Sequence, residues 1–269
     1  MSRNPAAYDV HPIIAEAYDL HETHTSDVEL IRRLIGGRKG LRILEPFCGT
    51  GRILLPLACD GHQVVGIDVS GHMLARARRK AEQLPPDVRQ RITLLQADAA
   101  VAGWPGGFDL VLLGGNCFYE LADAAEQEGC VASAAAAARP GGHVFVDSDH
   151  METPLTETWT RPGIRRTKWP SGRPADGSVL EGYTENLQCD AQARIWRARR
   201  TVLIRHPDGR TETFTHLQQK HPVGHDEVAG WLTAHGLVIE QTFGDHAGNP
   251  YMPQAPRATF WARVKGSDL

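Results

Sequence analysis

EPFCGTGR, residues 45–52, directly follows a short apolar run, LRILE, residues 41–45. Two glycines, Gly49 and Gly51, permit a sharp turn and let the backbone approach a ligand without a Cβ in the way. The next apolar run ends in an acidic residue, Asp68. A strand, a glycine-rich turn and a second strand that ends in a carboxylate predict an open parallel sheet. Ligands bind at the carboxyl ends of the strands in such a sheet.

Short apolar runs alternate with stretches of helical periodicity along the first half of the chain. The expected strands are residues 41–45, 63–68, 92–96, 108–113 and 143–147, and the expected helices are at about residues 52–59, 71–84 and 121–139. Strict alternation of this kind predicts parallel strands joined by right-handed crossovers, with helices on both faces of the sheet.

The pattern changes after His150. Residues 151–178 show no clear period, and three stretches of strand character follow, with Asp208-Gly209 as a hairpin turn signal between the last two. These stretches are residues 180–189, 195–205 and 210–219. A helix that contains Val228 and Leu232 then resumes the first pattern, and two strands follow it at residues 237–243 and 258–264.

These elements predict an α/β chain with a Rossmann-like, mostly parallel seven-stranded sheet, helices on both faces and an antiparallel β insertion after the fifth strand. Residues 1–150 are expected to form the ligand-binding core with an N-terminal helical cap. Residues 151–220 form the insertion, and residues 221–269 return to the core with the last helix and two strands. The long helix-free insertion suits a substrate lid more than a fold core.

Composition narrows the class of protein. The formal net charge of -3 argues against a protein that clamps a nucleic-acid backbone. The chain has five cysteines and no C-x-x-C spacing, which argues against a disulfide framework or a structural zinc site. The first residues contain no apolar signal region, and no apolar run is long enough to cross a bilayer. We expect a cytoplasmic protein with no nucleic-acid partner and no membrane partner.

The glycine-rich turn alone fits several nucleotide-binding classes. Leu54 stands where a dinucleotide-binding G-x-G-x-x-G motif has its third glycine, and no Gly-Lys-Ser/Thr follows as in a Walker phosphate loop. Glu45 at the end of the strand favours a ligand with an amino acid group over a pyrophosphate.

ILEPFCGTGR, VVGIDVSGHML and LLQADA resemble the first three motifs of class I S-adenosylmethionine-dependent methyltransferases. The resemblance covers about residues 10–150 and, more weakly, residues 222–265. It implies S-adenosyl-L-methionine as the cofactor. The cofactor-binding residues that it implies are Tyr18, Glu45, Gly49, Gly51, Asp68, Val69, Met73, Asp98, Ala99 and Asn116.

Two further segments resemble a narrower branch, the glycine and sarcosine N-methyltransferases and their small-molecule relatives. These segments are LGGNCFYEL, residues 113–121, and PGGHVFVDSDH, residues 140–150. Ala17-Tyr18-Asp19 resembles the Tyr-Asp ahead of the first motif in that branch. No match continues beyond His150. The Asn-Pro-Pro-Tyr signature of many methyltransferases that act on DNA and protein amines is missing, which favours a small-molecule acceptor.

The expected catalytic residues are His150 and Asp149, which come just after the fifth strand. His150 is the candidate general base, and Asp149 orients it or pairs with an acceptor ammonium. Tyr119 and Tyr251 are candidate substrate-binding residues, because aromatic faces hold cationic groups. No metal site is expected, since the paired histidines of the HETH segment, residues 21–24, have no obvious third ligand nearby.

The sequence therefore predicts a methyltransferase that moves a methyl group from S-adenosylmethionine to the nitrogen or oxygen of a small molecule. The alternatives are an NAD(P)-dependent oxidoreductase, a nucleic-acid or protein methyltransferase on the same sheet, and a binding protein that has kept the fold without catalysis. The identity of the acceptor and the choice between nitrogen, oxygen and carbon stay open, and so does a homodimeric state.

Overall fold

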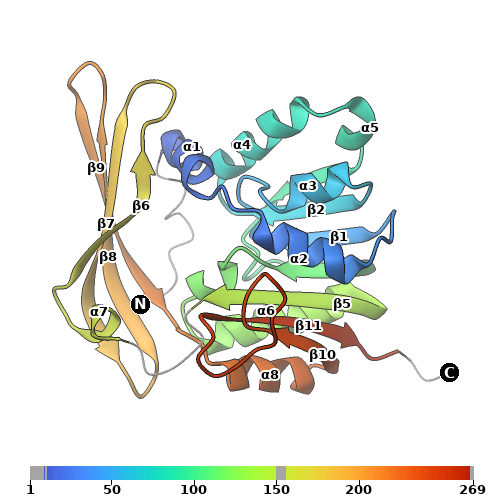
Figure 1. The fold of residues 1–269 in the computed structure, drawn as a ribbon. Helices are drawn as coiled ribbons and strands as arrows, with labels where there is room; N and C mark the ends of the chain where they lie inside the picture. Colours follow the sequence, from blue (N-terminus) through green and yellow to red (C-terminus); the bar gives the residue numbers. More distant parts are fainter. Residues whose placement is uncertain (1–8, 10, 150–155, 267–269) are drawn as a thin grey trace.

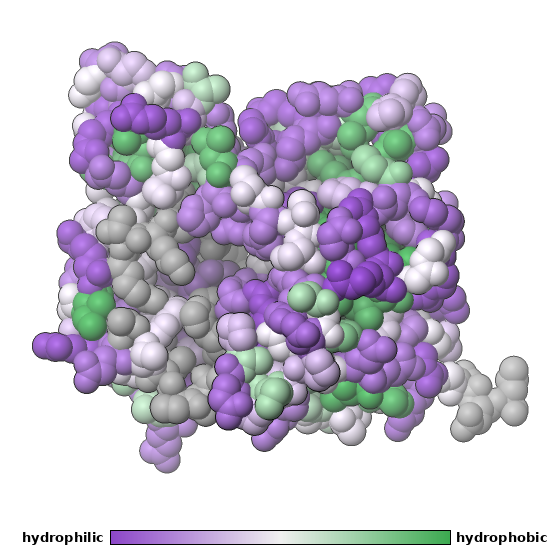
Figure 2. All heavy atoms as spheres, viewed as in Figure 1, coloured by the Kyte–Doolittle hydropathy of each residue, from purple (hydrophilic) through white to green (hydrophobic). Residues whose placement is uncertain are grey.

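The structure is a computed structural model that describes residue 9, residues 11–149 and residues 156–266. It contains a seven-stranded sheet and a separate four-stranded sheet, which stand side by side (Figure 1). Drawn as spheres, the molecule is indented between these two parts (Figure 2). Among the described residues, no helix has the length and apolar character that a bilayer crossing requires.

The seven-stranded sheet has the strand order β10-β11-β5-β4-β1-β2-β3. Its strands are β1 Arg42–Pro46, β2 Gln63–Asp68, β3 Ile92–Gln96, β4 Phe108–Leu113, β5 Ala138–Asp149, β10 Leu237–Phe243 and β11 Arg257–Val264. Strands β3, β2, β1, β4 and β5 are parallel, whereas β11 is antiparallel to both of its neighbours. The strand order reverses at β1, so the carboxyl ends of β1 and β4 form the crevice where ligands bind in open α/β sheets.

Helices cover both faces of this sheet. The helices on one face are α6 Ala124–Ala137 and α8 His225–Ala234, and those on the other are α2 Ser26–Ile35 and α3 Leu54–Cys59. Strand β4 shows why both faces are apolar, because Val111 and Leu113 pack with the first pair while Leu110 and Leu112 pack with the second. The predicted fold class is confirmed.

The antiparallel insertion is a sheet of order β6-β7-β8-β9. Its strands are β6 Arg165–Gly172, β7 Val179–Asp190, β8 Ile195–Arg205 and β9 Thr211–Lys220, and a short helix, α7 Glu157–Thr160, precedes them. Three of these strands match the three predicted stretches, and Gly209 at φ 86° makes the predicted turn between β8 and β9. Strand β6 was not predicted, because its RRTKWPSG sequence does not alternate apolar and polar residues.

Helix α1, Pro12–His21, lies between the insertion sheet and the core (Figure 1). Its buried residues Ile13 and Ile14 form one apolar cluster with Val202 and Ile204 of the insertion and with Met73 of α4, Gly71–Glu82. The short helix α5, Pro86–Arg89, follows α4. The N-terminal helix therefore packs against the insertion on one side and against the core on the other.

Asp19 near the end of α1 links this helix to the glycine-rich turn. Its carboxylate accepts hydrogen bonds from Thr50 Oγ1 at 2.6 Å, from Arg76 Nε at 2.8 Å and from Lys80 Nζ at 2.8 Å. Burial acts to raise the pKa of Asp19, but the hydrogen bonds from Arg76, Lys80 and Thr50 outweigh it and the pKa is lowered. The second residue of the Tyr-Asp pair thus joins three segments of the chain.

Replacement of Asp19 by alanine should lower the free energy of unfolding by about 1–3 kcal/mol, because the buried Thr50 and the half-buried Arg76 and Lys80 lose their common acceptor. Arg210→Ala is the matched control, since it removes an exposed ion pair with Asp208 and should leave the free energy of unfolding nearly unchanged. Urea unfolding of both variants measures the difference. An Asp19→Ala protein as stable as the control would show that α1 is held by its apolar face alone.

Candidate functional site

The turn between β1 and α3 has a backbone that few residues adopt. Gly49 and Gly51 have φ angles of 54° and 76°, as their predicted role requires, and Phe47 also has a positive φ of 62°. A bulky residue in this conformation is strained and marks a turn whose shape the surrounding fold imposes. Beneath the turn, a Cβ on Gly66 of β2 would lie 2.7 Å from Cys48 Sγ. The turn therefore packs directly against the neighbouring strand, with no room for a side chain at Gly66.

Asp68 at the end of β2 holds this turn in place. Its carboxylate accepts a hydrogen bond from Gly49 N at 2.8 Å and another from Ser70 N at 2.9 Å. Burial raises the pKa of Asp68, while these two backbone hydrogen bonds act in the opposite direction. Val69 follows at the half-buried edge of the same site. Asp68 therefore links the first two turns at the carboxyl edge of the sheet.

Glu45 lies under the turn, at 4% exposure. Its Oε2 atom is buried and has no hydrogen-bond partner among the described residues. Burial raises the pKa of this carboxyl group to about 8, and the charge of Arg52 only partly offsets that effect. A cationic group placed above the turn would supply the missing counter-charge. The residues present thus fit a ligand that carries an ammonium or sulfonium group.

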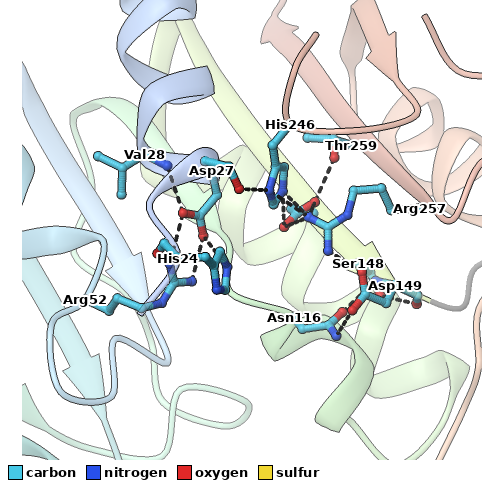
Figure 3. Close-up of polar contacts among 12 residues, drawn as sticks. His24, Asp27, Val28, Arg52, Asn116, Ser148, Asp149, His246, Arg257 and Thr259 are labelled. Carbon is cyan, nitrogen blue, oxygen red and sulfur yellow. Dashed lines mark hydrogen bonds and ion pairs between the residues drawn. The ribbon is translucent and has the colours of Figure 1, made fainter. Parts of the chain in front are cut away.

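Tyr18 and Arg52 stand beside Glu45. The Arg52 guanidinium forms a bidentate pair with Asp27 of α2, with N–O distances of 2.9 and 2.6 Å, and donates to the His24 carbonyl at 3.0 Å (Figure 3). Tyr18 also shares a side-chain hydrogen bond with Arg52, and burial raises the pKa of its hydroxyl to about 12. The tyrosine therefore keeps its proton and remains a hydrogen-bond donor at the site.

Asn116 and Asp149 are joined across the ends of β4 and β5. Asn116 donates from Nδ2 to the Asp149 carboxylate at 2.8 Å and accepts from Asp149 N at 2.6 Å. Asn116 has a left-handed backbone with φ 62°, which asparagine tolerates better than most residues. The second carboxylate oxygen of Asp149 pairs with Arg257 of β11. The candidate catalytic carboxylate is thus firmly oriented.

A polar cluster extends from Asp149 toward α2 (Figure 3). Asp147 of β5 accepts from Arg257 Nη1 at 3.0 Å and from Thr259 Oγ1 at 2.7 Å, and it lies 3.1 Å from His246 Nε2. The other imidazole nitrogen of His246 lies 3.0 Å from Ser26 Oγ. Asp147 is buried, which acts to raise its pKa, but His246 and Arg257 lower it. This cluster connects four segments at the edge that carries the site.

Three other predicted cofactor residues have mainly structural contacts. Met73 is 3% exposed, in the apolar cluster between α1 and α4. Asp98 caps the turn after β3 by accepting from Ala100 N at 3.1 Å, and Ala99 is buried in the core. All of them still follow β2 or β3 at the carboxyl edge. The ten predicted positions therefore fall on one edge of the sheet and on α1 beside it.

The structure describes only some of the predicted catalytic and substrate-binding residues. His150 lies outside the described residues, and the side chain of Tyr119, in the short 3-10 helix η2 Cys117–Glu120, is outside them too. The ring of Tyr251 stacks on the imidazole of His225 at 4.2 Å between centroids. Its contacts are with the core beside α8.

Sequence motifs did not predict Asp27, His246 or Arg257 as site residues, and they gave Arg52 no role. Only Arg52 carried a signal, since it directly follows the glycine-rich turn. Asp27 lies far from His246 and Arg257 along the chain, and only the fold brings it near them.

Comparison with known families finds a match over residues 43–142 to the family model described as a methyltransferase domain. This segment runs from β1 to β5 and contains the turn, Asp68 and Asn116. The match supports the predicted resemblance to class I methyltransferases. It does not test the narrower resemblance to glycine and sarcosine N-methyltransferases.

Individual relatives cover different parts of the chain. A ubiquinone biosynthesis O-methyltransferase of Alkalilimnicola ehrlichii is 30% identical over 130 residues, which are 48% of this chain and 50% of that protein. The chain thus spans about half the length of the curated relatives that it matches.

Solved structures extend the similarity to nearly the whole fold. An S-adenosylmethionine-dependent methyltransferase of Clostridium acetobutylicum has a TM-score of 0.72 at 15% identity, with 94% of this chain and 98% of that chain covered. The sugar N-methyltransferase KedS8 of a Streptoalloteichus species has a TM-score of 0.70 at 18% identity, with coverage of 99% and 97%. At these identities the likeness shows the fold, including the insertion.

Replacement of Asp27 by alanine should lower the free energy of unfolding by roughly 3–5 kcal/mol, because it leaves the nearly buried Arg52 without its bidentate partner. Glu181→Ala is the control, since both side chains of its ion pair with Arg205 are about half exposed. Thermal and urea unfolding of both variants provide the measurement. Equal losses of stability in the two proteins would contradict a structural role for the Arg52–Asp27 pair.

Proposed function

We propose that this protein is an S-adenosylmethionine-dependent methyltransferase that transfers a methyl group to the nitrogen or oxygen of a small-molecule acceptor. One observation carries the proposal. The segment that matches the methyltransferase domain also contains a buried carboxylate oxygen under a glycine-rich turn, Glu45 Oε2, that has no hydrogen-bond partner among the residues the structure describes. A ligand with a positively charged methionyl group would complete this site.

Different residues at the carboxyl edge would bind different parts of the cofactor. Glu45, Gly49 and Gly51 would face its amino acid part, with Tyr18 and Arg52 beside them. Asp68 and Val69 would hold the ribose, because a carboxylate at the end of β2 accepts hydrogen bonds from ribose hydroxyls. The residues that would border the adenine and the methyl group are Met73, Asp98, Ala99 and Asn116.

S-adenosylmethionine supplies a methyl group that its sulfonium already activates. The protein mainly has to hold the acceptor lone pair in line with the sulfur–methyl bond and keep water out. Asn116 and Asp149, fixed to each other and to Arg257, would form a rigid border of the acceptor space. Tyr119 and Tyr251 remain proposed acceptor-binding residues. His150 remains the proposed general base for a hydroxyl acceptor, because an amine acceptor needs only a neutral nitrogen.

A small-molecule acceptor has support from the names of the relatives, which include an O-methyltransferase of ubiquinone biosynthesis and a sugar N-methyltransferase. The same names keep both nitrogen and oxygen acceptors within the proposal. The glycine and sarcosine branch, a cytoplasmic location and a homodimer remain predictions from the sequence. Residues 151–220 are proposed to act as the substrate lid, and residues 1–150 and 221–269 as the core.

Asp68→Ala should weaken the binding of S-adenosylhomocysteine about 10- to 100-fold, because the ribose loses its acceptor and Gly49 loses its anchor. Titration calorimetry measures the change. Asp87→Ala removes an exposed carboxylate far from the turn and should leave the affinity unchanged. Wild-type affinity in the Asp68→Ala protein would remove the site assignment.

Cofactor binding should release a proton at neutral pH. With a pKa of about 8, Glu45 is mostly protonated in the free protein, and a bound cation favours its ionised form. Calorimetry of S-adenosylmethionine binding at pH 7, in two buffers of different ionisation enthalpy, counts the protons released. Glu45→Gln should release fewer protons than the wild type. Equal release from the two proteins would show that Glu45 does not sense the cofactor.

A further inference from the structure

One face of the insertion sheet looks toward the candidate site. On β9, Phe214 packs into the apolar cluster that contains Tyr18 of α1. Phe214, His216, Gln218 and Lys220 form a row on this face, because alternate residues of a strand point the same way. At the other end of the row, Gln218 Nε2 donates to Glu120 of η2 at 3.1 Å, and Lys220 pairs with the same carboxylate. His216 lies between these contacts on the same face, about 7 Å along the strand from each neighbour in the row. It therefore faces the space between α1 and the end of β4.

Two side chains in this row have unused hydrogen-bonding atoms. Both imidazole nitrogens of His216 and the Oε1 atom of Gln218 are buried and have no hydrogen-bond partner among the described residues. Burial and the charge of Arg200, directly opposite on β8, lower the pKa of His216 to about 4. The imidazole is thus neutral at physiological pH, with one donor and one acceptor nitrogen. A buried polar group without a partner destabilises the fold, so its presence here suggests a ligand that completes it.

The unused atoms restrict the chemistry of that ligand. Gln218 Oε1 can only accept a hydrogen bond, so an ionised carboxylate or phosphate cannot satisfy it. The positive charge of Arg200, directly opposite on β8, disfavours a cationic group at this position, while the charge of Lys220 is paired with Glu120. Hydroxyl groups carry no charge and both donate and accept. Adjacent hydroxyls of one ligand can therefore hydrogen-bond to the unused atoms of both the imidazole and the amide.

We propose that His216 and Gln218 bind the hydroxyl groups of a carbohydrate-like acceptor and present it to the cofactor side of the cleft. The inference rests on the proposed methyltransferase function and names the class of its acceptor. The insertion then serves as a recognition surface for the acceptor, while the core holds the methyl donor.

The first test is the stability of His216→Leu, with Thr213→Leu on the exposed face of the same strand as control. Because neither nitrogen of His216 has a partner in the part of the chain that the structure describes, leucine should leave the melting temperature unchanged or raise it. A histidine that served only the fold would give a lower melting temperature on replacement. A melting temperature clearly below that of the control would overturn the proposal.

The second test measures methyl transfer from radiolabelled S-adenosylmethionine to two amines that share a six-membered ring. D-glucosamine carries hydroxyls and cyclohexylamine carries none. The wild type should prefer glucosamine in kcat/KM calculated for the neutral form of each amine, since cyclohexylamine is the stronger base. His216→Leu should raise the KM for glucosamine about tenfold or more. His216→Asn keeps a neutral donor and acceptor and should restore part of the loss. S-adenosylhomocysteine affinity should stay unchanged in all three proteins.

The outcomes separate the two proposals. A wild-type protein that binds S-adenosylhomocysteine but transfers no methyl to glucosamine, or uses both amines equally, would overturn the acceptor assignment alone. So would an unchanged KM in His216→Leu. Absence of S-adenosylhomocysteine binding would remove the proposed function, and the acceptor assignment with it.

Discussion

The hydrogen bond from the Gly49 amide to the Asp68 carboxylate joins the ends of two adjacent parallel strands at the place where the sheet reverses its order. The strained turn, with positive φ angles at Phe47, Gly49 and Gly51, is the shape that this bond holds. Asp19 then fastens α1 to the same turn through Thr50. Because α1 carries the apolar cluster beneath the insertion, the position of the second sheet also depends on this turn.

A second set of charges fixes the other side of the site. The Arg52–Asp27 pair joins the residue after the turn to α2, and the cluster around Asp147 joins α2 to β5 and β11 through Ser26 and His246. Such buried pairs add little net stability compared with apolar packing, but their directional bonds define which segments meet. Desolvating these charges costs free energy, and their directional bonds give the edge around the crevice one defined shape.

The sequence predicted the repetitive parts of this structure well. Alternating apolar runs located the strands of the seven-stranded sheet, because buried parallel strands must be apolar. The glycine-rich turn and Asp68 were predicted to lie together at the carboxyl edge, and the structure joins them by a hydrogen bond. The sequence did not predict β6, whose residues lack alternation, nor the packing of Met73 under α1. His216 had no motif around it. Its importance depends on the face of β9 that it occupies and on Arg200 opposite, which tertiary structure alone decides.

Glu45 lies under the turn of the core, and His216 lies on β9 of the insertion sheet. Burial shifts their pKa values in opposite directions, up to about 8 for the carboxyl group and down to about 4 for the imidazole. Both shifts keep the side chain uncharged near neutral pH, because an isolated charge is costly where water is excluded. Each group nevertheless has a hydrogen-bonding atom with no partner among the described residues. Such a state is unfavourable for folding, but it leaves hydrogen bonds for ligands to make at the turn and on the insertion sheet.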